Sequence, residues 1–330
     1  MTSNKANPQI QANICAIFEC LITFEEYSVF LIAEAGGLLA LCEAMRTHGE
    51  HVELIQNACR VLSFLVRSAD PKSLASVNTA LGNCCLGALQ NHLENSEVEA
   101  AVMDTLCTCC GQDDYFKQIL VNDRCIHEII TAMTLQLGSS ELVQSGCRLL
   151  WILSGYANGR QIICESGGIP AIVNGMMAHN QSTAVIKEGL TALRNLAKEP
   201  SSKPMIESAG GETAVKYALW IHCRDPQVIA IALSTLNNIA VDSVTRTVAP
   251  MKEDILEVLL VAMRRFSMDE LVQKNACFYL KSCSYLPANL AQMSRKRSSL
   301  FPLLENASGS FPQHCAAHAD SIIAKVQRMQ

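Results

Sequence analysis

Apolar residues recur along the chain with a period of 43 to 44 residues. The clearest series consists of six leucines at steps of 44, 44, 43, 43 and 44 residues: Leu62, Leu106, Leu150, Leu193, Leu236 and Leu280. An apolar residue precedes each leucine by 17 positions: Met45, Leu89, Met133, Met176, Leu219 and Met263. A period of this length is typical of a solenoid, in which each unit buries its apolar face against the next.

Within the first full period the pattern predicts three helices. Residues 27–36 form a short apolar segment that ends at Gly36-Gly37, where glycine can adopt the positive φ of a helix C-terminus. Apolar residues then follow helical spacing over 38–47, and His48 and Gly49 mark the end of that helix. A longer helix with a strong apolar stripe is expected over 54–65.

The same register divides the chain into repeats. Six units are predicted at about 22–66, 67–110, 111–154, 155–197, 198–240 and 241–285. Residues 1–21 fit only a final helix, and residues 286–330 fit a degenerate last unit. Both ends are expected to act as caps that shield the apolar ends of the stack from water.

The expected fold is therefore an all-α, right-handed α-solenoid. A content of 49% hydrophobic and 5% aromatic residues suits aliphatic packing in a linear stack. The net charge of −5 argues against nucleic acid as the main ligand, because phosphate binding needs a strongly basic surface. Neither a signal sequence nor an apolar run of membrane-spanning length is present, which predicts a cytoplasmic protein, with a nuclear location also open.

Sixteen cysteines are spread over the chain, and several occupy one repeat position. These are Cys15, Cys59, Cys147 and Cys277. A cysteine at a position where other repeats carry Met or Leu is expected to pack as a small apolar residue, which favours a reducing compartment. A denser cluster comprises Cys84, Cys85, Cys107, Cys109 and Cys110. Its Cys107-x-x-Cys110 pair leaves a metal or redox sensor as an alternative, although no second pair exists to complete a zinc site.

Histidines also share one register, at the predicted C-terminus of each second helix. They are His48, His92, His179 and His222, with Gln136 in the remaining unit. A side chain that donates to the last carbonyls of a helix is favoured at this end. We therefore expect helix capping here and no metal site, because neighbouring units stack too far apart to share one zinc ion.

Two third helices end with the motif Leu-x-Asn-[Leu/Ile]-Ala, at 193–197 and 236–240. Together with the Gly-Gly junction and the period, these endings make residues 8–285 resemble the armadillo repeat. In that family the motif asparagine lies on the inner, concave face and holds the main chain of an extended peptide, a role that the resemblance assigns to Asn195 and Asn238. The other units carry different residues at this position: Phe64, Thr108, Ile152 and Ser282.

The resemblance does not extend to importin-type armadillo proteins. Those proteins place a Trp four residues before the asparagine, where this chain has Thr191 and Ser234, so a nuclear import receptor is not expected. The segments 141–147 and 270–277 instead resemble a divergent subgroup found in the armadillo region of leucine-rich repeat kinases. No kinase, GTPase or leucine-rich segment accompanies them.

We expect a non-catalytic scaffold or adaptor that captures an extended or helical segment of another protein along the third helices. The candidate partner-binding residues on the concave face are Arg60, Arg148, Trp151, Arg194, Asn195, Asn237 and Asn238. Three arginines favour a peptide with acidic or phosphorylated side chains. An alternative is a regulatory domain that binds a small anionic metabolite near Arg148, Trp151 and Arg194. No motif predicts a catalytic residue, a metal site or a cofactor.

Overall fold

The computed structural model describes residues 1, 4–25, 27–122, 125–156, 158–241 and 249–329, and these contain twenty helices and no strand. The fold is an α-solenoid, as the period predicts. The chain forms two compact units, Met1–Ala178 and His179–Gln330, and each is described by itself. The division falls inside the predicted fourth repeat, between its second and third helices.

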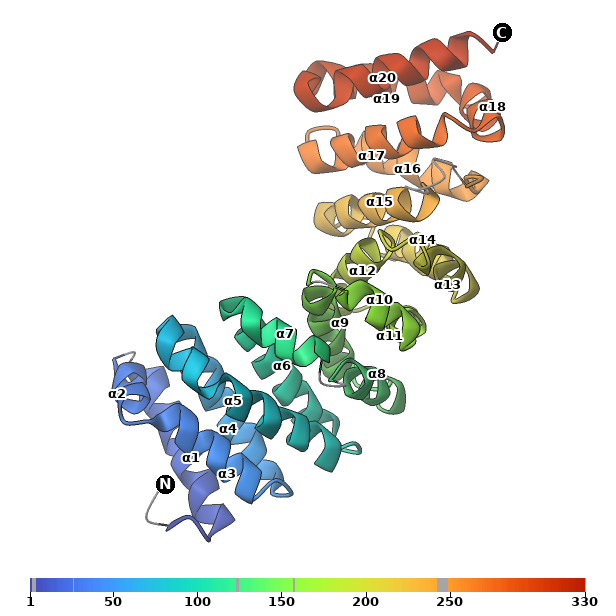
Figure 1. Ribbon diagram of the computed structural model, residues 1–330. Coiled ribbons are helices and arrows are strands. Elements are labelled where there is room, and N and C mark those ends of the chain that lie inside the picture. The colour runs from blue at the N-terminus through green and yellow to red at the C-terminus, as the bar shows by residue number, and fades with distance from the viewer. Residues whose placement is uncertain (2–3, 26, 123–124, 157, 242–248, 330) are drawn as a thin grey trace. The chain divides into compact units, whose positions relative to one another are not determined.

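The first unit contains eleven of the described helices (Figure 1). They are α1 (Pro8–Phe24), α2 (Ser28–Glu34), α3 (Gly37–Thr47), α4 (Val52–Ser68), α5 (Pro71–Asn91), α6 (Ser96–Gln112), α7 (Asp114–Asn122), α8 (Cys125–Leu135), α9 (Ser140–Ser154), α10 (Gly159–Glu165) and α11 (Gly168–Ala178). The third helices of this unit are α1, α4, α6 and α9, and each packs on the next along the chain.

The second unit repeats the arrangement. It contains α12 (Thr183–Leu196), α13 (Ser202–Ser208), α14 (Gly211–Ile221), α15 (Pro226–Ala240), α16 (Glu253–Arg265), α17 (Glu270–Cys283), α18 (Pro287–Arg295), α19 (Arg297–Ser310) and α20 (Pro312–Gln327). Its third helices, α12, α15, α17 and α20, also pack in sequence. Residues 242–248, at the start of the predicted sixth repeat, lie outside the described part of the chain.

The Gly-Gly pairs close the turn between the first and second helices for two separate reasons. The first glycine of each pair takes a positive φ: 79° at Gly36, 84° at Gly167 and 75° at Gly210. The second glycine lies against an isoleucine five residues earlier, and a Cβ on Gly168 would lie 2.4 Å from Cγ2 of Ile163. Only glycine satisfies both conditions.

The predicted second repeat lacks this turn. Ala80 and Leu81 occupy the double-glycine position, and α5 runs without interruption from Pro71 to Asn91. The three-helix pattern of the first repeat therefore becomes two helices here, because Ala80 and Leu81 replace the glycine pair whose first member takes a positive φ in the other turns.

Most third helices begin with the same N-cap. A polar side chain accepts a hydrogen bond from the backbone N–H three residues later, as in Asn95 with Val98 at 3.1 Å and Asp269 with Val272 at 3.0 Å. The other residues in this role are Asn7, His51, Ser139, Ser182 and Asp225. Each cap satisfies one of the free N–H groups of the first turn.

Side chains also join each third helix to the one before it. The Thr105 hydroxyl donates to the Cys59 carbonyl at 3.1 Å, and Thr235 makes the same bond to the Leu190 carbonyl at 3.1 Å. Each buried hydroxyl also lies near a carbonyl one turn earlier on its own helix, at 2.9 Å for Ala101 and 2.8 Å for Ile231, so its single proton is shared between two acceptors. Their register matches the period, and the bonds therefore reinforce the stacking of neighbouring repeats.

The first and last helices of the described chain differ in the side chains that they expose. Helix α1, which includes most of residues 1–21, exposes a row of large apolar side chains: Ile10, Ile17, Leu21 and Phe24. At the other end, α20 exposes mostly polar and small residues: Gln313, Ala317, Asp320, Gln327 and Arg328. The capping role of residues 1–21 and 286–330 stays a prediction.

Candidate functional site: the third-helix surface

A groove of about 690 Å³ runs over the third helices of the first unit. Its lining residues come from α1, α4, α6 and α9, and include Glu19, Arg60, Phe64, Arg67, Asp104, Thr108, Arg148 and Ile152. Positions one period apart lie side by side because the third helices pack in sequence. We call this surface the α1–α9 groove.

Three lining residues occupy the position where the armadillo motif has its asparagine. Phe64, Thr108 and Ile152 all contribute to the wall of the groove. The Phe64 side chain is 37% exposed, and Ile152 is half-buried. This part of the groove therefore offers apolar contacts and one hydroxyl, in place of the amides that would hold a peptide main chain.

Two of the predicted arginines in this groove are already paired with carboxylates. The Arg60 Nε atom lies 3.6 Å from a Glu19 carboxylate oxygen, and the Arg60 guanidinium also donates to the Asn57 Oδ1 atom at 3.0 Å. Arg148 Nη1 lies 3.6 Å from Asp104 Oδ1. Both pairs join neighbouring third helices and are partly exposed, so each contributes at most about 1 kcal/mol to stability.

Arg67 lines the same groove and was missed by the sequence reasoning. It lies two turns after Arg60 on α4 and is exposed. Within the described part of the chain it has no ion-pair partner. The signal that could have identified it is the seven-residue spacing from Arg60, which places both side chains on one face of a helix.

The remaining predicted residue of the first unit is Trp151, on α9. It is half-buried, next to Leu150 and Leu153 in the core. Its exposed portion is compatible with partner contact, but it is absent from the lining of the α1–α9 groove. Its assignment as a partner-binding residue stays a prediction.

In the second unit, the predicted residues lie on α12 and α15. The Asn238 amide donates to the Arg194 carbonyl at 2.9 Å, so this nitrogen joins two adjacent third helices. Lys198 donates to the Asn195 Oδ1 atom at 3.5 Å. Asn237 is buried, and its Oδ1 atom has no hydrogen-bond partner. Asn238, one of the two asparagines that the resemblance selects for peptide binding, therefore already has a structural partner.

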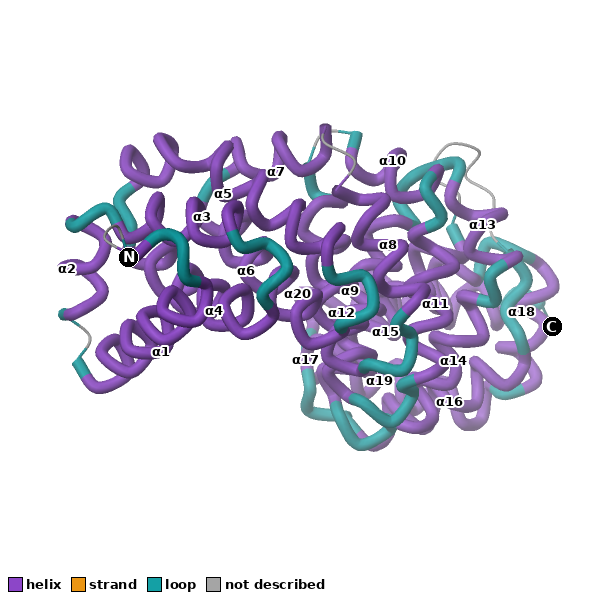
Figure 2. The backbone as a smooth tube through the Cα atoms, turned by 90° about the horizontal axis from the view of Figure 1, so that it is seen from below, coloured by secondary structure: helices purple, strands orange, loops and turns teal. Residues whose placement is uncertain are grey.

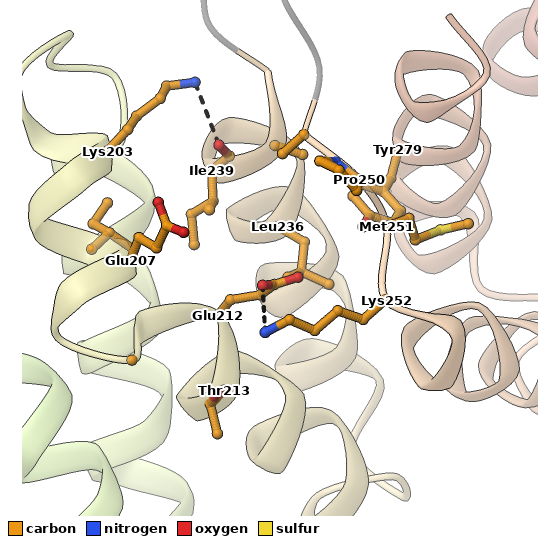
Figure 3. A pocket seen from close by; sticks show the side chains of 14 residues that line it. Lys203, Glu207, Glu212, Thr213, Leu236, Ile239, Pro250, Met251, Lys252 and Tyr279 are labelled. Carbon is orange, nitrogen blue, oxygen red and sulfur yellow. Dashed lines mark hydrogen bonds and ion pairs between the residues drawn. The ribbon is translucent and has the colours of Figure 1, made fainter. Parts of the chain in front are cut away.

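A second cavity, of about 590 Å³, lies in the second unit among α13, α14, α15 and α17 (Figure 3). Its cations are engaged by neighbours: Lys252 contacts Glu212 at 2.8 Å, and Lys203 donates to the Ile239 carbonyl at 3.4 Å and to the Val241 carbonyl. Figure 3 marks the Lys252–Glu212 and Lys203–Ile239 contacts with dashed lines. The positive and negative charges of the lining therefore balance, which leaves no excess positive charge for an anionic ligand.

A third hollow, of about 430 Å³, lies between α14 and α16 and is mainly apolar. Trp220 is 68% exposed and Val261 52% exposed along it. Lys216 and Asp254 form an ion pair of 2.7 Å at its rim. Sequence reasoning missed this hollow because Trp220 and Val261 belong to different helices and the register of the leucines does not connect them.

His48, His92 and His222 join neighbouring repeats, and the expectation that these side chains cap their own helices is wrong. His92 Nε2 lies 2.7 Å from the Gly49 carbonyl, and His222 Nε2 lies 2.8 Å from the Asn180 carbonyl. His48 and Gln136 make the same contact with the Lys5 and Leu93 carbonyls. The side chain is long enough to reach the turn of the preceding repeat, where a carbonyl oxygen needs a hydrogen-bond donor.

The cysteine cluster lies in the core of the first unit. All five of its members are buried, and Cys107 Sγ lies 3.8 Å from the Ser145 carbonyl oxygen. Burial raises the pKa of the Cys110 thiol to about 12, which keeps it protonated at neutral pH. Among the described residues, no group of three or more His, Cys, Asp or Glu side chains is arranged to hold a metal ion.

Comparison with known proteins identifies the family. A sequence model described as the GAC ARM domain matches residues 21–263. The chain belongs to this armadillo-repeat family. No curated protein matches the chain. In the described part of the chain, no single helix is long and apolar enough to cross a membrane. Helices α2 and α3 would be long and apolar enough together, but the chain bends by 71° between them.

Solved structures of similar fold come from natural and engineered proteins. One concerns the conserved phosphorylation switch that controls the interaction between cadherin and beta-catenin; it is 14% identical, with a TM-score of 0.63 over 98% of this chain and 74% of that one. Two engineered proteins are each 19% identical, with TM-scores of 0.60 and 0.57. They cover 72% and 74% of this chain, and 92% and 97% of their own. Family and fold together describe a protein-binding repeat scaffold.

Proposed function

We propose that the α1–α9 groove captures a segment of a partner protein that carries one apolar and one acidic or phosphorylated side chain. The observation that supports this most directly is the groove itself: about 690 Å³ on the third helices, with exposed Phe64 and Arg67 one turn apart on α4. An apolar side chain would pack on Phe64 and Ile152, and an anionic group would bind the Arg67 guanidinium.

The paired arginines have a different part in this mechanism. Arg60 and Arg148 are held by Glu19 and Asp104, so a new anion must compete with an existing carboxylate. They therefore join the third helices that form the groove, and each pair is neutral overall. Arg67, with no such competitor among the described residues, is the side chain that we expect to provide most of the charge recognition.

The cadherin and beta-catenin structure supports the phosphorylated variant of this proposal by analogy. A phosphorylation switch controls the interaction of those proteins. At 14% identity the likeness concerns the fold alone, so the analogy only makes a phosphorylated segment a natural ligand to test. A phosphate would add charge and acceptor oxygens that suit the guanidinium of Arg67.

The test is selection of peptides from a random display library on the immobilised protein. We expect the selected peptides to share an acidic residue close to a large apolar one. In titrations followed by fluorescence anisotropy, Arg67→Glu and Phe64→Ala should each weaken binding of a selected peptide at least about tenfold, equivalent to about 1.4 kcal/mol. Phosphorylated and unphosphorylated versions of the same peptide then show which anion the groove prefers.

Lys72→Glu provides the matched control. Lys72 is exposed on α5 in the same unit and does not line the groove, so this charge reversal should leave the affinity unchanged. Circular dichroism must show equal helix content for all variants. If Arg67→Glu and Lys72→Glu bind the selected peptides equally well, the groove is not the binding surface.

A further inference from the structure

The turn between α16 and α17 carries two adjacent arginines shortly before a serine. Arg264 and Arg265 are the last residues of α16, and Ser267 and Met268 follow them after Phe266. No other Arg-Arg pair occurs in the sequence. Two cations at this spacing before a serine, with an apolar residue after it, form a charge pattern by which one class of protein kinases selects its substrates.

The side chains of this segment are available to a partner. Both arginines are exposed, and neither forms an ion pair with another described residue. The helix dipole explains why cations are stable at the end of α16, but it leaves their guanidinium groups unpaired. Met268 is 78% exposed. Ser267 is half-buried, but its hydroxyl forms no hydrogen bond within the described part of the chain, so its modification breaks none.

This turn also lacks the bond that joins equivalent turns to the preceding repeat. In four other repeats, a histidine or glutamine occupies the position of Phe266 and reaches a carbonyl 42 or 43 residues earlier. A phenyl ring has no donor for such a bond. No described side chain donates to the Cys223 carbonyl, 43 positions before Phe266. Figure 2 draws the turns between helices, including the one from α16 to α17, in teal.

The bonds that remain hold the turn mainly at its two ends. The Phe266 carbonyl accepts a hydrogen bond from the Asp269 N–H at 3.0 Å, and the Asp269 side chain caps α17. Between these two residues, Ser267 and Met268 form no hydrogen bond with another described residue. A kinase that binds this segment in an extended form must also open the last turn of α16. Helix ends open most readily, and the missing link to the preceding repeat lowers the cost further.

We propose that Ser267 is a phosphorylation site for a protein kinase that selects arginines before its acceptor. The Ser267 Oγ atom attacks the γ-phosphorus of Mg²⁺-bound ATP. The new Oγ–P bond forms as the bond from this phosphorus to the β–γ bridging oxygen breaks, ADP leaves, and the hydroxyl proton passes to the catalytic aspartate of the kinase.

Phosphorylation would change the charge of this edge of the second unit. The phosphate adds about two negative charges beside two unpaired arginines, so an exposed cationic turn becomes nearly neutral. The site lies in the other unit from the α1–α9 groove, and the proposal does not depend on that groove.

The test is incubation of the full chain with the catalytic subunit of cAMP-dependent protein kinase, Mg²⁺ and ATP, followed by mass spectrometry of the intact chain and of its peptides. We expect a single phosphate, on Ser267, and no incorporation at this position in Ser267→Ala. The double variant Arg264→Ala with Arg265→Ala should lower the initial rate at least about tenfold, because two charged contacts with the kinase are lost.

Arg295→Ala with Arg297→Ala is the matched control. These arginines are also exposed in the second unit, and they lie shortly before Ser298 in the first turn of α19. Their removal should leave the rate at Ser267 unchanged. Circular dichroism must show equal helix content for all variants.

Phe266→His tests the contribution of the missing link, with Phe266→Leu as its control. Histidine restores a donor that can reach the Cys223 carbonyl, whereas leucine has none. Phosphorylation of Ser267 should therefore be slower in Phe266→His than in Phe266→Leu. Hydrogen exchange of residues 264–268, measured without the kinase, should slow in the same variant.

Three results would overturn the proposal. The first is no incorporation of phosphate into the intact chain, which would show that the turn does not open to a kinase. The second is phosphate at Ser298 or elsewhere while Ser267 stays unmodified. The third is an equal rate at Ser267 for the two double-arginine variants, which would show that the Arg264-Arg265 pair does not direct the kinase.

Discussion

Glu99 is a carboxyl group at a core position. It is fully buried on α6, and neither of its oxygens has a hydrogen-bond partner. The equivalent residues on α1 and α17 are Gln11 and Gln273, whose amides each donate to two backbone carbonyls, those of Met1 and Asn4 and those of Met263 and Phe266. Glutamine thus satisfies a position where a carboxylate cannot donate.

Burial raises the pKa of Glu99 from 4.5 to about 7 in the folded protein. Since the folded state holds the proton more tightly, the contribution of this group to stability is highest below pH 4.5, falls as the pH rises from 4.5 to about 7, and changes no further above that. We predict that Glu99→Gln stabilises the protein at pH 8 by roughly 1 to 3 kcal/mol and has much less effect at pH 4.5. Urea unfolding at both pH values measures the difference.

The control for this prediction is Glu97→Gln, on the same turn of α6 but exposed. Its effect on stability should be small, because the side chain is exposed and its hydrogen bond from Gln56 lies on the surface. Equal pH dependence of the two variants would show that the buried carboxyl is not the source of the effect.

Among the elements, the turn between the first and second helices depends most on a single residue. A Cβ on Gly168 would lie 2.4 Å from Ile163 Cγ2 and 2.9 Å from the Ile163 carbonyl oxygen. We predict that Gly168→Ala lowers the free energy of unfolding by about 1 to 3 kcal/mol, because the backbone of α10 or α11 must move. Thermal or urea denaturation followed by circular dichroism measures the loss.

Gly87→Ala should change the free energy of unfolding in the opposite direction and serves as the comparison. Gly87 lies within α5, where a Cβ would meet no atom within 4 Å. Alanine should therefore stabilise the protein by up to about 1 kcal/mol through helix propensity. A destabilising Gly87→Ala, or a neutral Gly168→Ala, would contradict this account of the two glycines.

For the whole molecule, the division into two units predicts that a core substitution in one unit destabilises mainly that unit. Leu150→Ala, in the core of α9, should destabilise the first unit by about 2 to 5 kcal/mol. Repeats of a solenoid contact only their neighbours, so the helices of the second unit should be affected less. Hydrogen exchange read by mass spectrometry should accelerate in α6 and α9 and remain nearly unchanged in α17 to α20.

Leu193→Ala is the reciprocal variant, since Leu193 is fully buried on α12 in the second unit. It should accelerate exchange in α15 and leave α4 and α6 nearly unchanged. Equal acceleration throughout the chain in both variants would mean that the two units unfold as one cooperative body.

The sequence by itself determined the α-solenoid, the apolar stripes of the third helices and the turns at the Gly-Gly pairs, whereas the N-caps were recognised only in the structure. The predicted features are local: a helical stripe and a positive φ each depend on a few neighbouring residues. The three-helix pattern was inaccurate at α5, although the absence of a glycine pair at Ala80 and Leu81 was visible in the sequence.

Only the tertiary structure decided which polar groups are engaged and which apolar surface is uncovered. Arg60 pairs with Glu19, His92 reaches the Gly49 carbonyl, and Asn238 binds the Arg194 carbonyl, each across a boundary between repeats. The period brings such residues near one another, but it does not specify whether a donor and an acceptor lie within hydrogen-bonding distance. The exposed row on α1 likewise depends on which helices cover it, and that is a property of the packed chain.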